Sequence, residues 1–175
     1  MAFRHFVVAG ALALAGCTSG PTVKTDFDPA TNFSGYRSYS WIYSTAPQGM
    51  NPLLFERVRA SIDRSFAARG FAQAMPGDFA VAFTIGRRDS VQITDFGAYG
   101  PSYRPYAWGP GFHDIDVRQV TDGTLVIDIY DTTTRKPIWH GIATQQVNPD
   151  KVDQALIDTA VDAVLASFPP QPRPK

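Results

Sequence analysis

The single cysteine of the 175-residue chain ends the sequence Leu14-Ala15-Gly16-Cys17. A leucine and two small residues before a cysteine are typical of a lipobox, the site at which a bacterial lipoprotein precursor is cut and lipidated. We therefore predict cleavage between Gly16 and Cys17 and a lipid on Cys17, which would hold the chain on a membrane. The mature chain would have no free thiol left for a disulfide or a cysteine-bound zinc ion.

The segment ahead of this cysteine, residues 1–16, has the parts of a signal peptide. Arg4 supplies a positive charge, and residues 6–14 form an apolar run that is too short to span a bilayer. The alternatives are an ordinary secretory signal with an incidental cysteine, or a buried N-terminal helix. Thr18 stands where an aspartate would suggest retention in the inner membrane, so we expect the periplasmic face of the outer membrane. Residues 17–22 would form the lipidated tether.

Two histidines remain after the predicted cleavage, and either could serve catalysis or metal binding. His140 follows Trp139 in an apolar run, which favours a packed or solvent-facing side chain. His113 and Asp114, with Asp116 nearby, could be metal ligands or a base with its orienting carboxylate, but they are too few to complete such a site. We therefore interpret them as a polar cluster at the edge of a loop.

The remaining candidates for chemistry also have ordinary structural interpretations. Ser90 and Ser102 lack the sequence context of a nucleophile elbow. Asp128 and Asp131 fit a solvent-facing strand position and a turn cap. The glycines between 97 and 111 are followed by neither a Lys-Ser/Thr pair nor a helix start, so they do not form a phosphate loop. We predict no catalytic residue, no metal and no cofactor, and hence a protein that is not an enzyme.

Residues 97–112 contain four glycines, three prolines and five aromatic residues, which precludes a regular element. Aromatic side chains are costly to leave in water, and tyrosine and tryptophan suit partner recognition because each joins a large contact area to one polar group. The segment is therefore a candidate binding surface, and the alternative is a lid that packs on its own sheet. The candidate residues are Tyr99, Tyr103, Tyr106, Trp108 and Phe112.

The net charge and the length of the chain indicate which partners and how many domains to expect. The chain has 16 basic and 16 acidic residues, and losing Arg4 with the signal peptide would leave a net charge of −1. This balance gives no electrostatic reason to bind nucleic acid or an anionic membrane surface. The mature chain suffices for one domain, which we place at residues 23–168. Residues 169–175 are rich in proline, and we expect an extended, disordered tail there.

The elements that must position these residues are predicted from the spacing of apolar side chains. Alternation of apolar and polar residues indicates a strand, whereas apolar residues three and four apart indicate a helix. Strands are expected at residues 23–27, 36–43, 79–85, 125–129 and 138–144, and the alternation of Ile115, Val117 and Gln119 leads into the turn before residues 125–129. Helices are expected at residues 51–70 and 148–168.

Caps and turns set the expected boundaries. Asparagine followed by proline opens both helices, at Asn51 and Asn148, because asparagine caps a helix and proline is tolerated in its first turn. Gly70 should end the first helix, with Phe71 folded back on its last turn. Asp122-Gly123 predicts a two-residue hairpin. The expected buried faces are Tyr39, Trp41 and Tyr43 in the second strand, Phe55, Val58, Ile62 and Phe66 in the first helix, and Val152, Ala155, Leu156, Ala160, Ala163, Val164 and Phe168 in the second.

These elements predict an α+β fold, with an antiparallel sheet of about five or six strands and both helices packed on one face. Residues 79–85 would be an interior strand, with Val91 and Ile93 in its extension or in a partner strand. Phe83 and Leu156 should be buried in the layers of sheet and helix that face each other.

Three groups of motifs stand in order along nearly the whole mature chain. They are Asp26-Phe27-Asp28, Phe33 and Tyr36-Arg37-Ser38-Tyr39-Ser40-Trp41 after the lipobox, then Asn51-Pro52 with its striped helix and Gly70-Phe71, and finally Gly123-Thr124-Leu125-Val126-Ile127-Asp128 with Trp139-His140-Gly141. Together they resemble the bacterial lipoprotein family named domain of unknown function 4136, although His140 stands where an arginine would be expected. The resemblance implies a Gram-negative envelope protein with a diacylglyceryl group and an amide-linked acyl chain on Cys17. It implies no activity.

Three classes of function remain open. A non-enzymatic envelope lipoprotein that binds or scaffolds another component is favoured, because the chain offers surface but no constellation for chemistry. A carrier of a small apolar or lipidic ligand would need a pocket under the 97–112 loop. A hydrolase with an unrecognised site would need a buried His–Asp–Ser set. The expected partners are a membrane, through the lipid on Cys17, and an envelope protein, but no nucleic acid.

Overall fold

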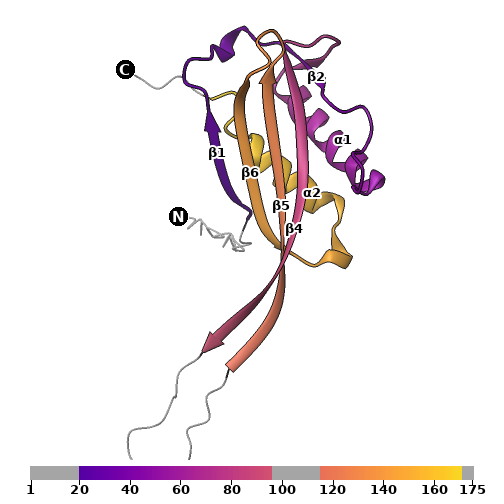
Figure 1. Cartoon of the computed structure of the whole chain (residues 1–175), viewed down its shortest axis with the longest axis vertical. Coiled ribbons are helices and arrows are strands. Elements are labelled where there is room, and N and C mark those ends of the chain that lie inside the picture. Colours follow the sequence, from indigo (N-terminus) through magenta and orange to yellow (C-terminus); the bar gives the residue numbers. More distant parts are fainter. Residues whose placement is uncertain (1–19, 96–114, 171–175) are drawn as a thin grey trace, which may run out of the picture.

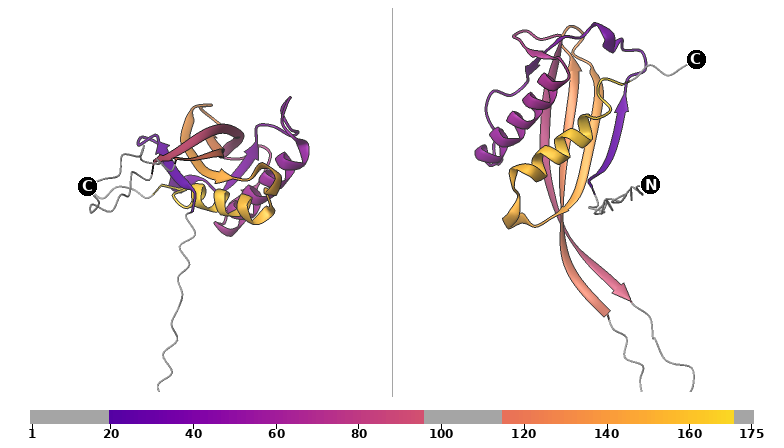
Figure 2. Two further views of the ribbon diagram at one scale, coloured as in Figure 1. Left: turned by 90° about the horizontal axis from the view of Figure 1, so that it is seen from below. Right: turned by 180° about the vertical axis from the view of Figure 1, so that it is seen from behind.

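The computed structural model of the chain describes residues 20–95 and 115–170. Two helices cover one face of a six-stranded sheet, so the predicted α+β fold is confirmed (Figure 1, Figure 2). The helices are α1 (Pro52–Ala68) and α2 (Gln154–Leu165). In order across the sheet, the strands are β1 (Thr22–Phe27), β6 (Pro137–Val147), β5 (Ile115–Asp131), β4 (Phe79–Asp95), β2 (Ser38–Trp41) and β3 (Ala72–Gln73).

The sheet is mostly antiparallel but not entirely so. β1, β6, β5 and β4 pair antiparallel in that order, whereas β2 runs parallel to both β3 and β4. The chain passes through α1 between β2 and β3, and such a helical crossover is what joins parallel strands. The prediction of a wholly antiparallel sheet is corrected at this edge, where the two-residue β3 was also not foreseen.

The first helix has the caps and the buried face that its sequence predicts. The side chain of Asn51 accepts hydrogen bonds from the backbone N–H groups of Leu53 and Leu54. Gly70 adopts a φ of +84°, which glycine tolerates, and the N–H of Phe71 bonds to the carbonyl of Phe66. The expected stripe of Phe55, Val58, Ile62 and Phe66 is buried throughout.

The second helix begins later than predicted, and its buried face matches the prediction only toward its C-terminal end, where Val164 and Phe168 are buried. Asn148 caps only a 3-10 turn at Pro149–Lys151, and α2 starts after Asp153, whose carboxylate accepts from the N–H of Leu156. Leu156 is half-buried, so its predicted place in the core is wrong, and Ile157 is buried instead. Several alanines made the apolar stripe of this helix ambiguous. The buried residues of α2 are Ile157, Val161, Val164 and Leu165.

The predicted hairpin at Asp122-Gly123 does not exist. Both residues lie within β5, opposite Arg88 and Arg87 of β4, and Gly123 also pairs with Gln145 of β6. A side chain at Gly123 would press on Val147, whose Cγ1 lies 3.1 Å from the position of a Cβ. The glycine therefore serves close packing inside a strand instead of a turn.

β4 and β5 are each 17 residues long and pair over their whole length, from Phe79↔Asp131 to Asp95↔Ile115. Residues 91–95 thus extend β4, one of the two predicted possibilities. In Figure 1 the far end of this hairpin runs below the body of the domain. None of the helices in the described ranges 20–95 and 115–170 is long and apolar enough to cross a membrane.

The core lies between the helices and the inward face of the sheet. Phe83, as predicted, is buried, and its ring stacks on Phe55 of α1 with the centroids 5.0 Å apart. A Cβ on Gly141 would clash with the ring of Trp139 and would approach Val164 Cγ1 to 2.6 Å, so this glycine lets α2 pack directly on β6. Tyr43, by contrast, is 48% exposed, because β2 ends before it.

Candidate functional site

The residues singled out by the sequence for binding or lipidation lie outside the described part of the chain. β4 ends at Asp95 and β5 begins at Ile115, on either side of the 97–112 segment. The predictions for this segment and for the N-terminus therefore stay predictions. The residues concerned are Gly16, Cys17, Tyr99, Ser102, Tyr103, Tyr106, Trp108, Phe112, His113 and Asp114.

His140 lies on the sheet face that the helices leave uncovered. Its Nδ1 is 2.6 Å from Oδ1 of Asp128 on β5, and its register partner on β1 is Asp26. The side chain is 45% exposed, which fits the solvent-facing one of the two positions expected for it, packed or solvent-facing. Acidic residues on both neighbouring strands could pair with an arginine, the residue expected at this position from the family resemblance.

The Tyr36–Trp41 motif holds the parallel edge of the sheet to the rest of the domain. Tyr39 Oη and Trp41 Nε1 both donate to Oδ1 of Asp63 on α1, over 2.6 and 3.0 Å. Tyr36 Oη donates to Asp131 over 2.8 Å. Burial, and then the hydrogen bond to Asp131, raise the pKa of Tyr36 to about 12, and burial with the bond to Asp63 raises the pKa of Tyr39. Both phenols are structural donors.

Two further aspartates hold the backbone in place at this end of the sheet by accepting hydrogen bonds from N–H groups. Asp78 accepts from the N–H groups of Arg37 and Ser38, and these bonds hold the pKa of its carboxyl below the ordinary value. Asp131 accepts from the N–H of Thr134, which likewise lowers the pKa of Asp131, so its predicted role as a turn cap is confirmed. Sequence reasoning singled out Asp131 but missed Asp78, because its partners lie about 40 residues away.

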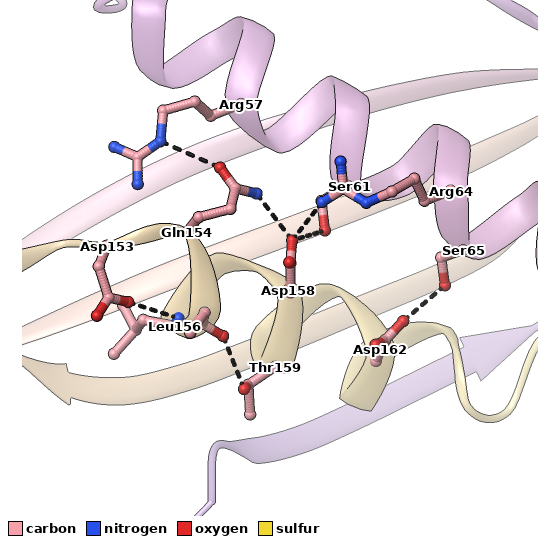
Figure 3. Close-up of polar contacts among 11 residues, drawn as sticks. Arg57, Ser61, Arg64, Ser65, Asp153, Gln154, Leu156, Asp158, Thr159 and Asp162 are labelled. Carbon is pink, nitrogen blue, oxygen red and sulfur yellow. Dashed lines mark hydrogen bonds and ion pairs between the residues drawn. The ribbon is translucent and has the colours of Figure 1, made fainter.

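Polar side chains also join α1 to α2, as Figure 3 shows. Asp158 of α2 accepts from Ser61 and from Arg64, each over 2.7 Å, and from Gln154 over 2.8 Å. The bond from Ser61, then that from Gln154 and the charge of Arg64, keep the pKa of Asp158 below its ordinary value. These charged groups hold two helices together and do not converge on an open site.

An apolar cavity of about 280 Å³ lies between both helices and the inward face of the sheet. Its lining includes three polar residues, Arg87, Thr124 and Gln145, and Oε1 of Gln145 is buried without a hydrogen-bond partner in the described structure. Sequence reasoning missed this cavity, since its wall combines residues from five elements. Its apolar lining includes Leu54, Val58, Leu125, Ala143, Ile157 and Ala160.

The far end of the β4–β5 hairpin is the second unusual feature. Pairing with β2 ends at Trp41↔Val81, and pairing with β6 ends at Thr121↔Val147. From Ser90↔Val120 to Asp95↔Ile115 the two strands pair with each other, and no third strand of the described chain accompanies them. We call this two-stranded part, residues 90–95 and 115–120, the arm (Figure 1).

Known structures share this architecture at low sequence identity. A PDZ domain protein from Parabacteroides distasonis matches 85% of this chain with a TM-score of 0.58 and 11% identity, and the chain spans 35% of that protein. The PelC dodecamer from Paraburkholderia phytofirmans matches 83% of this chain and 95% of PelC, with a TM-score of 0.50 and 11% identity. At these identities the likeness shows the fold alone. No curated protein is significantly similar in sequence.

The family described as Domain of unknown function (DUF4136) has a sequence model that matches residues 23–170. This range includes the motifs from Asp26 to Gly141, but not the lipobox, and it includes every described strand and helix apart from the first residue of β1. The chain therefore belongs to this family, the Domain of unknown function (DUF4136).

Proposed function

We propose that this chain is a lipid-anchored envelope protein, on the periplasmic side of the outer membrane, that binds or scaffolds another envelope component without catalysing a reaction. The observation that carries the proposal is the arm. A two-stranded ribbon is marginally stable in water by itself, and its outer edges offer unpaired backbone groups. A strand or a surface of a partner protein that packs on the arm would stabilise it and could pair with these backbone groups.

The PelC structure is relevant to the kind of partner. PelC has the same fold and is assembled as a dodecamer. Further copies of this chain are therefore one class of partner for the arm, alongside a different envelope protein. The charge-balanced composition of the chain favours either class of partner over nucleic acid.

A deletion of the arm tests this proposal. Arg88 and Asp122 face each other in the β4–β5 ladder, so residues 89–121, the arm together with the residues between its two strands, can be replaced by an Asn-Gly turn. We expect the domain to keep its urea midpoint and to lose the discrete cross-linked species that the intact protein forms in the envelope. Removal of residues 171–175 is the control. Unchanged cross-linking after the arm deletion contradicts the proposal.

A second candidate function is that of a carrier for a small apolar ligand. The observation in its favour is the 280 Å³ cavity, whose described wall is almost entirely aliphatic. Its described lining comes from α1, α2, β4, β5 and β6, together with the segments that flank β1 and α2. The two functions use separate parts of the molecule, so the arm deletion should leave ligand binding intact.

A further inference from the structure

We propose that the cavity binds a free long-chain fatty acid, with one unbranched acyl chain between the helices and the sheet and the carboxylate beside Arg87 and Gln145. This inference rests on the carrier function and adds to it the class of ligand and the residues that would recognise each end.

The size and the lining of the cavity suit a single acyl chain. At about 280 Å³ the cavity is near the lower end of the range of roughly 300–1,000 Å³ for small-molecule sites. Leu54 and Val58 of α1 face Leu125 and Ala143 of the sheet across it, with Ala160 of α2 completing the wall. Flexible aliphatic walls accommodate a methylene chain, and this volume is too small for the two tails of a phospholipid.

The polar groups lie together at one place on the wall. Arg87, Gly123 and Gln145 are register partners on three adjacent strands, and the methyl groups of Val147 pack over Gly123 between the other two. The side chain of Arg87 is 62% exposed, and its ion pair with Asp89 is loose at 4.0 Å. Its guanidinium can therefore turn to a carboxylate without giving up a close partner.

Gln145 supplies the second contact to the head group. Its Oε1 is buried and has no hydrogen-bond partner in the described structure. The oxygen can accept from a protonated carboxyl, and rotation of the amide by half a turn presents its N–H groups to a carboxylate. A fatty acid would thus satisfy a polar group that is costly to leave unpaired.

Binding can be measured with the full chain carrying Cys17→Ala, purified without detergent. The probe is cis-parinaric acid, displaced by palmitate or by hexadecanol. We expect saturable binding of one probe per chain and tighter displacement by palmitate than by hexadecanol. Absence of saturable binding, or equal displacement by the two, overturns the proposal.

Two matched pairs of variants locate the site. Ala160→Leu fills the cavity, and the loss of room for about two methylenes should weaken binding roughly tenfold, whereas Ala155→Leu on the exposed side of α2 should not.

The second pair of variants tests the contact to the carboxylate. Arg87→Gln should weaken the affinity for palmitate about two- to five-fold and leave the affinity for hexadecanol unchanged. Arg88→Gln, on the opposite face of β4, is its control. Urea midpoints near that of the parent protein ensure that each variant is folded, and unchanged affinities for Ala160→Leu and Arg87→Gln overturn the assignment.

One arm of the experiment separates a free fatty acid from the lipid expected on Cys17. Palmitate should displace cis-parinaric acid from the lipidated wild-type protein in phosphatidylcholine vesicles as it does from the Cys17→Ala chain. Binding by the Cys17→Ala chain alone would mean that the protein's own acyl chain fills the cavity, which overturns a free fatty acid as the occupant. Loss of arm-dependent cross-linking, measured separately, bears only on the scaffolding function.

Discussion

Asp63 shows how much a single carboxylate contributes to this fold. It lies on α1 and accepts from Tyr39 Oη and Trp41 Nε1, whose side chains are both buried. Asp63→Ala leaves two buried donors unpaired, at a cost of about 1–3 kcal/mol each. We expect urea unfolding to show a loss of roughly 2–4 kcal/mol.

Tyr39→Phe is the control for this prediction. It removes one donor and leaves Trp41 bonded to Asp63, so its loss should be smaller than that of Asp63→Ala. Equal midpoints for Asp63→Ala and the wild-type protein would show that these bonds contribute nothing to stability, and that the two rings are held by packing alone.

Between elements, the contact of α1 with α2 should depend on pH. Hydrogen bonds from Ser61 and Gln154, with the charge of Arg64, lower the folded-state pKa of Asp158. The carboxylate therefore stabilises the fold above the unfolded-state pKa, and this stability is lost as the pH falls through the folded-state value. Because Asp158 is 40% exposed, Asp158→Asn should cost only about 1 kcal/mol at pH 7.

Urea titrations from pH 7 to pH 2.5 check this expectation. The difference between Asp158→Asn and the wild-type protein should shrink toward the acid end, since the wild-type carboxyl is then also neutral. Asp162→Asn on the same helix is the matched control. Asp162 accepts a hydrogen bond from Ser65, so this variant should lose less free energy of unfolding than Asp158→Asn. A difference that stays constant over this range would rule out the titration of Asp158 as its cause.

A second series of variants compares how much buried residues between the sheet and the helices contribute to the free energy of unfolding. Phe83→Ala and Ile157→Ala each remove a buried side chain and should cost about 2–5 kcal/mol. Leu156→Ala should cost only about 1 kcal/mol, because Leu156 is half-buried beside the cavity and little new empty space forms. A loss for Leu156→Ala as large as that for Ile157→Ala would contradict the observed burial of Ile157 in place of Leu156.

For the whole molecule, location depends on the predicted lipid. Several acyl chains, at about 0.8 kcal/mol per buried methylene, anchor a protein durably where a single chain does not. Cys17→Ala should therefore move the protein from the membrane pellet to the soluble fraction, or leave it uncleaved. Fractionation of Cys17→Ala in the pellet as a cleaved protein would contradict lipidation at this residue. Thr18→Ala is a suitable control, since it leaves the cysteine intact.

Local signals in the sequence determined a large part of the structure. The cap at Asn51, the turn at Gly70 and the stripe of large side chains in α1 were all predicted, because each depends on residues within a few positions of one another. The alternation in residues 79–85 likewise indicated an interior strand, since its period of two separates a buried face from a second face.

Tertiary contacts decided the rest. Asp122-Gly123 has the local preference of a turn, yet pairing with β4 on one side and β6 on the other continues the strand through it. Tyr36 bonds to Asp131, 95 residues away, and the cavity draws its wall from five elements. No local pattern encodes such partners, because which side chains meet depends on the order and register of the strands, and these are set by the whole folded chain.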